Sequence, residues 1–207
     1  MAKSRSPRAL TGEECRRIIE RFKGMFHRHS IDITQHALGE DLAEIDWLAS
    51  IRGDVCAAGS PAWQDQPRAT RSLRKVLLTE RRSRALEKCS GLAGFPGIIR
   101  HLKCLRAEAA YSASDASDQA WDRLYEVEIA ARLAHMPVSI SFAEPDVLAA
   151  DSTGETVAFA CKRPRELGTV RKAMFKAFEQ LHAHGGMGFV AINADLLLNP
   201  IASSCFP

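Results

Sequence analysis

The stretch VSISFAEPDVLAADSTGETVAFACK, residues 138–162, decides the fold of this 207-residue chain. Its first part, residues 138–142, alternates apolar and polar side chains, which is the pattern of a half-buried strand. A second strand follows Pro145, and residues 156–161 form a third. The turn-forming residues 151–154 separate the last two strands. The stretch therefore predicts three short strands in succession, of which the last two form a hairpin.

Helical patterns lie on both sides of these strands. Residues 118–135 form one helix, which begins at Asp118 and is stopped by Pro137. Residues 166–184 form another helix, and residues 188–193 form a last strand. The face of the second helix that we expect in the core carries Val170, Met174, Ala177, Phe178 and Leu181. The order helix–strand–strand–strand–helix–strand predicts an α/β (α+β) core with a mixed sheet.

The first half of the chain reads as helical throughout. We expect helices over residues 11–28, 37–51, 70–89 and 98–110, and a loop over residues 53–69, which are rich in glycine and proline. Thr11 and Glu14 have the spacing of a capping box. The small, polar residues 111–119 read as a linker or a cap. The sequence thus predicts a helical, partly basic region over residues 1–110 and an α/β core over residues 111–207.

The composition excludes several classes of protein. With 46% apolar and 26% charged residues, it is that of an ordinary soluble domain rather than a collagen-like or low-complexity chain. No apolar run approaches the ~18 residues of a membrane span, and no secretory signal opens the chain. The 6 cysteines include no C-x-x-C pair. We expect a cytoplasmic protein without a membrane partner.

Three side chains of the second half suggest shared chemistry. The hairpin brings Asp146 opposite residues 160–161, so Asp146 and Lys162 should be close neighbours. Glu126 lies on an otherwise apolar face of its helix, where a carboxylate needs a partner. Two acids and a lysine at one edge of a sheet can hold Mg²⁺ and activate a water molecule.

In this order the residues resemble the PD-(D/E)xK, or restriction-endonuclease-like, nucleases. The resemblance covers residues 118–195, with no counterpart for residues 1–110. It rests on Pro145-Asp146, Ala160-Cys161-Lys162, Tyr125-Glu126, Phe159–Pro164, Phe178–Leu181 and Gly188–Ile192. It implies a nuclease that depends on Mg²⁺ or Mn²⁺ and hydrolyses DNA phosphodiester bonds. In that enzyme Asp146 is the principal metal ligand, Glu126 is a second ligand, Lys162 positions the water, and Gln180 is a supporting polar residue.

One position departs from the family pattern. Ala160 stands where the family has a second acid, which weakens the expected metal site. Glu144, Glu128 or Glu179 could supply the missing carboxylate. The alternative is a catalytically inactive module that keeps the nuclease fold and binds nucleic acid or a protein partner. A third interpretation is a helical protein-binding partner in which the motif is accidental.

The near-neutral total charge of +3 conceals alternating blocks of charge. Residues 66–110 carry a net charge of +8 and residues 111–160 a net charge of −7. The first block, with basic residues beside Lys162, predicts contacts to DNA phosphates. The candidate contacts are Arg71, Arg74, Lys75, Arg81, Arg82, Arg84, Arg163 and Arg165. Alternatively, the basic helix is a solvated face that pairs with the acidic residues 31–65. A protein partner of the N-terminal helices and a homo-oligomer stay open.

Overall fold

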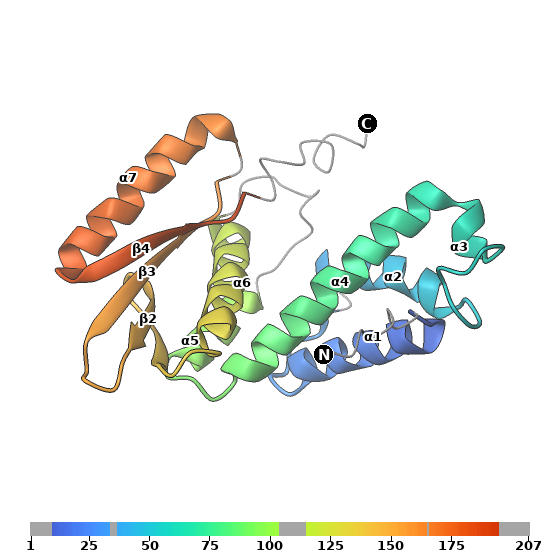
Figure 1. The fold of residues 1–207 in the computed structure, drawn as a ribbon, viewed down its shortest axis with the longest axis horizontal. Helices are drawn as coiled ribbons and strands as arrows, with labels where there is room; N and C mark the ends of the chain where they lie inside the picture. The colour runs from blue at the N-terminus through green and yellow to red at the C-terminus, as the bar shows by residue number, and fades with distance from the viewer. Residues whose placement is uncertain (1–9, 34–36, 104–114, 165, 195–207) are drawn as a thin grey trace, which may run out of the picture. The chain divides into compact units, whose positions relative to one another are not determined.

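The computed structural model describes residues 10–33, 37–103, 115–164 and 166–194 (Figure 1). It divides the chain into two compact units, Met1–Ser83 and Arg84–Pro207, which are described separately. The boundary that the sequence suggests, between residues 110 and 111, lies outside the described residues. No described helix combines the length and the apolar character needed to cross a membrane.

The first unit contains α1 (Gly12–His27), α2 (Ala37–Ala49), α3 (Pro61–Gln64) and most of α4 (Gln66–Cys89). The predicted capping box of α1 is confirmed. The Glu14 N–H donates to Thr11 Oγ1 at 3.1 Å, and the Thr11 N–H donates to Glu14 Oε2 at 3.2 Å. Apolar side chains of α1 and α2 are fully buried and form the core of this unit, among them Ile19, Phe22, Phe26, Ile45 and Leu48.

The loop predicted for residues 53–69 is wrong in its second half. Ser60 caps α3 by accepting the Trp63 N–H at 3.3 Å, and Pro61 occupies the first turn. Pro67 lies in the first turn of α4, which begins at Gln66. A proline is tolerated there because the first N–H groups of a helix have no partner within the helix. Both prolines therefore start helices.

The second unit contains the predicted α/β core. Its elements are the end of α4, α5 (Phe95–Leu102), α6 (Asp115–Leu133), β1 (Ser139–Ala143), β2 (Asp146–Ala150), β3 (Thr156–Lys162), α7 (Leu167–His184) and β4 (Met187–Ile192). The strands form one open sheet in the order β1-β2-β3-β4. The first two pairings are antiparallel and the β3–β4 pairing is parallel. The predicted element order and the mixed sheet are confirmed.

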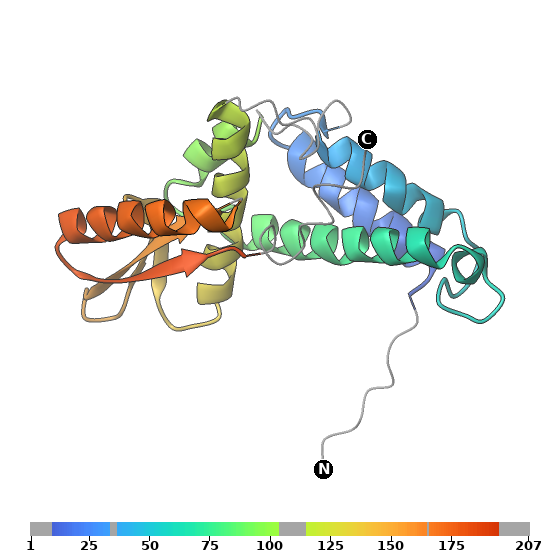
Figure 2. The same ribbon diagram turned by 90° about the horizontal axis from the view of Figure 1, so that it is seen from above.

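Two helices cover different parts of this sheet. α6 packs against β1, β2 and β3, whereas α7 packs against β3 and β4 (Figures 1 and 2). Gly188 of β4 faces α7, because a Cβ atom there would lie 2.4 Å from Leu181 Cδ2. Ala158 is its neighbour on β3, so Ala158 and Ala160 also face α7. Asp146 and Lys162 lie at the ends of adjacent strands, where a site can open.

Three predicted details of this unit need correction. The helix expected from residue 118 begins at Asp115, so the last part of the predicted linker is helical. The helix expected over residues 98–110 is α5, which starts at Phe95, packs on α6 and β1, and ends at Leu102. Phe178 is not in the core but is 53% exposed. Because α7 covers only two strands, its contact stripe is narrow and centres on Ala177, which is fully buried.

Candidate functional site

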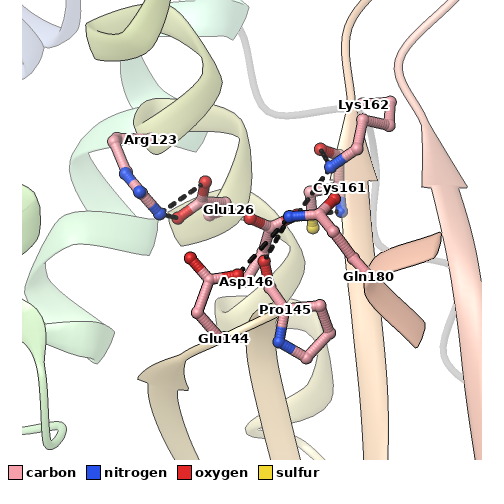
Figure 3. Close-up of polar contacts among 8 residues, drawn as sticks. All are labelled: Arg123, Glu126, Glu144, Pro145, Asp146, Cys161, Lys162 and Gln180. Atoms are coloured by element: carbon pink, nitrogen blue, oxygen red, sulfur yellow. Dashed lines mark hydrogen bonds and ion pairs between the residues drawn. The ribbon is translucent and has the colours of Figure 1, made fainter. Parts of the chain in front are cut away.

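Asp146 and Lys162 form the centre of the site, and their predicted proximity is confirmed (Figure 3). Lys162 Nζ donates to Asp146 Oδ2 at 3.0 Å and to the Cys161 carbonyl oxygen at 2.9 Å. Asp146 Oδ2 also accepts the Cys161 N–H at 2.6 Å. The Asp146 carboxylate thereby accepts a hydrogen bond that a backbone carbonyl would accept if the pairing of β2 with β3 continued beyond Val147 and Phe159. This arrangement ties the start of β2 to the end of β3.

The environment of Asp146 has opposing effects on its ionisation. Burial raises the pKa of the Asp146 carboxyl above its ordinary value. The Lys162 ammonium and the Cys161 N–H oppose this effect because they stabilise the charged form. Lys162 and the Cys161 N–H therefore stabilise the ionised form of Asp146 relative to the protonated form.

Glu126 reaches the same site from α6 and is only 2% exposed. Arg123 Nη1 donates to both carboxylate oxygens, at 2.9 Å and 2.7 Å. The pKa of Glu126 is raised to about 8, chiefly by burial and also by the negative charge of Asp146, although Arg123 opposes the shift. Figure 3 shows the Arg123–Glu126 pair beside Asp146. The partner expected for a carboxylate on an apolar helix face is therefore Arg123.

Sequence reasoning missed Arg123. A signal was available, because Arg123 lies three residues before Glu126, which is a spacing that brings side chains together on a helix. Burial acts to lower the pKa of the Arg123 guanidinium, but the acids Glu126, Asp146 and Glu144 together raise it. Arg123 and Lys162 are thus two fixed cations that face three acids of the site.

Gln180 joins α7 to the turn between β1 and β2. Its Nε2 atom donates to the Pro145 carbonyl oxygen at 3.3 Å and to Glu144 Oε2 at 3.4 Å. Its Oε1 atom is buried and has no hydrogen-bond partner among the described residues. Gln180 positions the turn that carries Glu144 and Asp146, and Glu144 itself is exposed.

A pocket of about 240 Å³ opens beside these residues. Arg123, Glu144 and Asp146 line one part of it. α5 and its N-cap residue line the other part, through Gly94, Gly97, Ile98 and His101. Sequence reasoning assigned α5 no role in the site, because nothing in the local sequence shows that α5 packs beside β1. The pocket is open enough for a small ligand or one group of a larger one.

Ala160 is fully buried and brings no polar atom to the site. Its backbone pairs with Val190 of β4, and its side chain lies on the face covered by α7. Within the described ranges, no group of three His, Cys, Asp or Glu side chains is arranged to hold a metal ion. Of the acids considered as substitutes, Glu144 lines the pocket with Asp146. Glu128 is buried on α6, and Glu179 is exposed on α7.

The candidate phosphate contacts that the structure describes fall into three groups, and one more candidate is not described. Arg71, Arg74, Arg81 and Arg84 are exposed on α4. Lys75 and Arg82 form ion pairs with Asp41 of α2. Such pairing with the acidic residues 31–65 is what the alternative interpretation of this helix predicts. Arg163 is nearly buried, with its guanidinium 5.5 Å from the centre of the Trp121 ring and Nε 3.7 Å from Asp122 Oδ1. Arg165 lies outside the described residues.

Fold and site together define an α/β protein with an open, mixed four-stranded sheet and an acid–lysine pair at the ends of two adjacent strands. Compared with protein-family models, with curated proteins and with solved structures, the chain matches none of them.

Proposed function

We propose that this chain is a nuclease of the PD-(D/E)xK, restriction-endonuclease-like type that hydrolyses DNA phosphodiester bonds with Mg²⁺ or Mn²⁺. The observation that carries the proposal is the 3.0 Å contact between Lys162 Nζ and Asp146 Oδ2, with Glu126 buried beside it. The motif residues thus converge, although 15 residues separate Asp146 from Lys162 in the chain.

The residues present fit a divalent cation only in part. Asp146 is the principal ligand, and the exposed Glu144, which lines the same pocket, is the acid that can replace the one missing at position 160. Glu126 contributes a third carboxylate once Arg123 releases it. When bound, the cation would neutralise charge that develops on the phosphate. With alanine at position 160, we expect weaker metal binding than a site with both family acids would have.

Lys162 and Gln180 have distinct tasks in this proposal. The Lys162 ammonium lies 3.0 Å from Asp146 Oδ2, where it can orient the attacking water and stabilise negative charge. Gln180 acts through the turn, because it holds the Pro145 carbonyl and the Glu144 carboxylate. The exposed arginines of α4 would contact backbone phosphates without reading sequence.

The first experiment measures cleavage and metal binding together. Purified protein is incubated with plasmid, linear and single-stranded DNA in Mg²⁺ or Mn²⁺, and its thermal stability is measured with and without each metal. We expect cleavage that Lys162→Met and Asp146→Asn abolish, and a metal-induced stabilisation that Asp146→Asn removes. Lys162→Met keeps most of the apolar stem and removes only the charge. Absence of both cleavage and thermal shift would overturn the enzyme proposal.

A second candidate function is a nuclease-fold module without catalysis, which binds nucleic acid or a protein partner. The observation that favours it is the fully buried Ala160, together with the Arg123 guanidinium that holds Glu126. Ala160→Glu distinguishes the two functions, with Ala160→Gln as a control of equal size. If the native protein is inactive and only Ala160→Glu gains metal-dependent cleavage, the inactive module is the correct function. If the native protein cleaves and Lys162→Met does not, the enzyme is.

A further inference from the structure

β4 forms one edge of the sheet and carries an unusual sequence for an edge. Among the described residues its only strand neighbour is β3, so the other side of β4 presents unpaired backbone groups. Its sequence MGFVAI, Met187–Ile192, contains no charged residue and no proline. Soluble proteins ordinarily protect such edges with charges, prolines or a covering segment. We expect an apolar, unprotected edge of this kind to pair with a partner strand.

Large apolar side chains are exposed on both sides of this edge. Met187 and Phe189 of β4 alternate with Gly188, which faces α7, so they lie on the opposite face of the sheet. On α7, Leu167, Phe175 and Phe178 are exposed. Each of these five side chains is more than half exposed. At roughly 200 Å² for each side chain, they present about 500 Å² of apolar surface per chain.

The size of this surface fits a second copy of the chain. Two copies would bury about 1,000 Å² from these side chains alone, before backbone and polar rim are added, and stable interfaces bury about 1,200–2,000 Å² in total. The unpaired edge of a strand is complementary to itself when the two strands run antiparallel about a two-fold axis. The same axis brings α7 antiparallel to α7 of the second copy.

We propose that two copies of this chain associate through β4, which makes one continuous sheet across the two-fold axis, with α7 packed against α7 of the second copy. The interface uses Phe178 and Phe189, both more than half exposed, as its apolar anchors. It involves neither the Asp146–Lys162 site nor any metal or DNA, and its test is independent of the proposed activity.

The test measures the molecular mass of the full chain by sedimentation velocity and light scattering from about 1 to 100 µM, a range that covers dissociation constants typical of modest interfaces. We expect twice the 22.8 kDa chain mass at the higher concentrations. Phe178→Glu and Phe189→Lys should each weaken the association at least about tenfold. The matched control is Met136→Glu, an exposed methionine before β1 at the other edge of the sheet, which should leave the mass unchanged. Circular dichroism melts verify that each variant is folded.

A chain that is monomeric at 100 µM would overturn the proposal and would indicate that residues 195–207 or another protein cover this edge. A dimer that survives both Phe178→Glu and Phe189→Lys would overturn it as well, since its interface lies elsewhere.

Discussion

Glu126 should make the stability of this protein depend strongly on pH, and Glu126→Gln should remove that dependence. The carboxyl group is almost fully buried, and burial raises its pKa from the ordinary 4.5 to about 8, despite two contacts from Arg123. Glutamine has nearly the same size and can still accept a hydrogen bond from Arg123. The substitution therefore removes the ionisable group with little change in packing.

The magnitude follows from the two pKa values. Between pH 4.5 and about 8, the native state binds the Glu126 proton while the unfolded state releases it. The stability contributed by this group is thus fully present below pH 4.5 and is lost as the pH rises towards 8. Each pH unit is worth 1.36 kcal/mol, so the loss between pH 5 and pH 8 is about 4 kcal/mol. That is a large part of the ~5–15 kcal/mol of a typical domain.

Urea unfolding in EDTA, at half-unit steps from pH 5 to pH 8, measures this effect without interference from metal ions. The stability of wild type minus that of Glu126→Gln should fall by about 4 kcal/mol across the range. The raised pKa of Asp146 acts in the same direction but is present in both proteins. Glu87→Gln, the same change at an exposed position of α4, is the matched control. Parallel curves for wild type and Glu126→Gln would refute the reasoning, because Glu126 would then be ionised and paired with Arg123 throughout.

Three further predictions concern the fold and the basic helix. Gly94→Ala should destabilise the protein by about 3 kcal/mol in urea unfolding, because φ is 84° and the new Cβ would lie 2.2 Å from the Phe142 carbonyl oxygen. Gly97→Ala, in the same helix with open space around it, should be neutral or slightly stabilising, and equal losses at both positions would contradict this account. Thr11→Ala should cost about 1 kcal/mol by the same measurement, because α1 loses its capping box, and an unchanged midpoint would show that the box contributes nothing. If α4 binds DNA through phosphates, Arg74→Gln should lower the salt dependence of binding by about one unit of slope in fluorescence titrations, equally for all sequences.

The sheet could be predicted because its signals are local. The order of the elements can be predicted without any knowledge of the packing. It follows from the alternation within the strands, the turn Asp151–Gly154 and the helix expected over residues 166–184. The short turn also fixes the register, which places Asp146 next to the end of β3. The contact between Asp146 and Lys162 follows from that register alone.

What the sequence could not supply depends on packing between distant segments. The sequence predicts a helix over residues 98–110 without assigning it a function, and only the folded chain brings Gly94 and His101 to the pocket beside Asp146. Phe178 has the spacing of a core residue, yet α7 has too little sheet beneath it to cover that position. The pairing of Lys75 and Arg82 with Asp41 likewise joins residues that lie more than 30 positions apart.

Position 160 connects the electrostatics of the site to its proposed chemistry. A second acid there would lie next to Asp146, and two adjacent buried carboxylates favour a divalent cation because they repel one another without it. With alanine, Lys162 is within 3.0 Å of Asp146, and Glu126, which lies within 2.7 Å of Arg123, keeps its proton up to about pH 8 because burial raises its pKa, so little acid charge is left uncompensated. A metal ion must then compete with these cations rather than fill a site of uncompensated negative charge. Glu144 is the acid that can most readily turn towards a metal ion, because it is exposed and lines the pocket beside Asp146. Among the described residues, its side chain has one hydrogen bond, the long 3.4 Å contact from Gln180. If the chain is an enzyme, its activity therefore depends on Glu144 more than on any acid within the original motif other than Asp146.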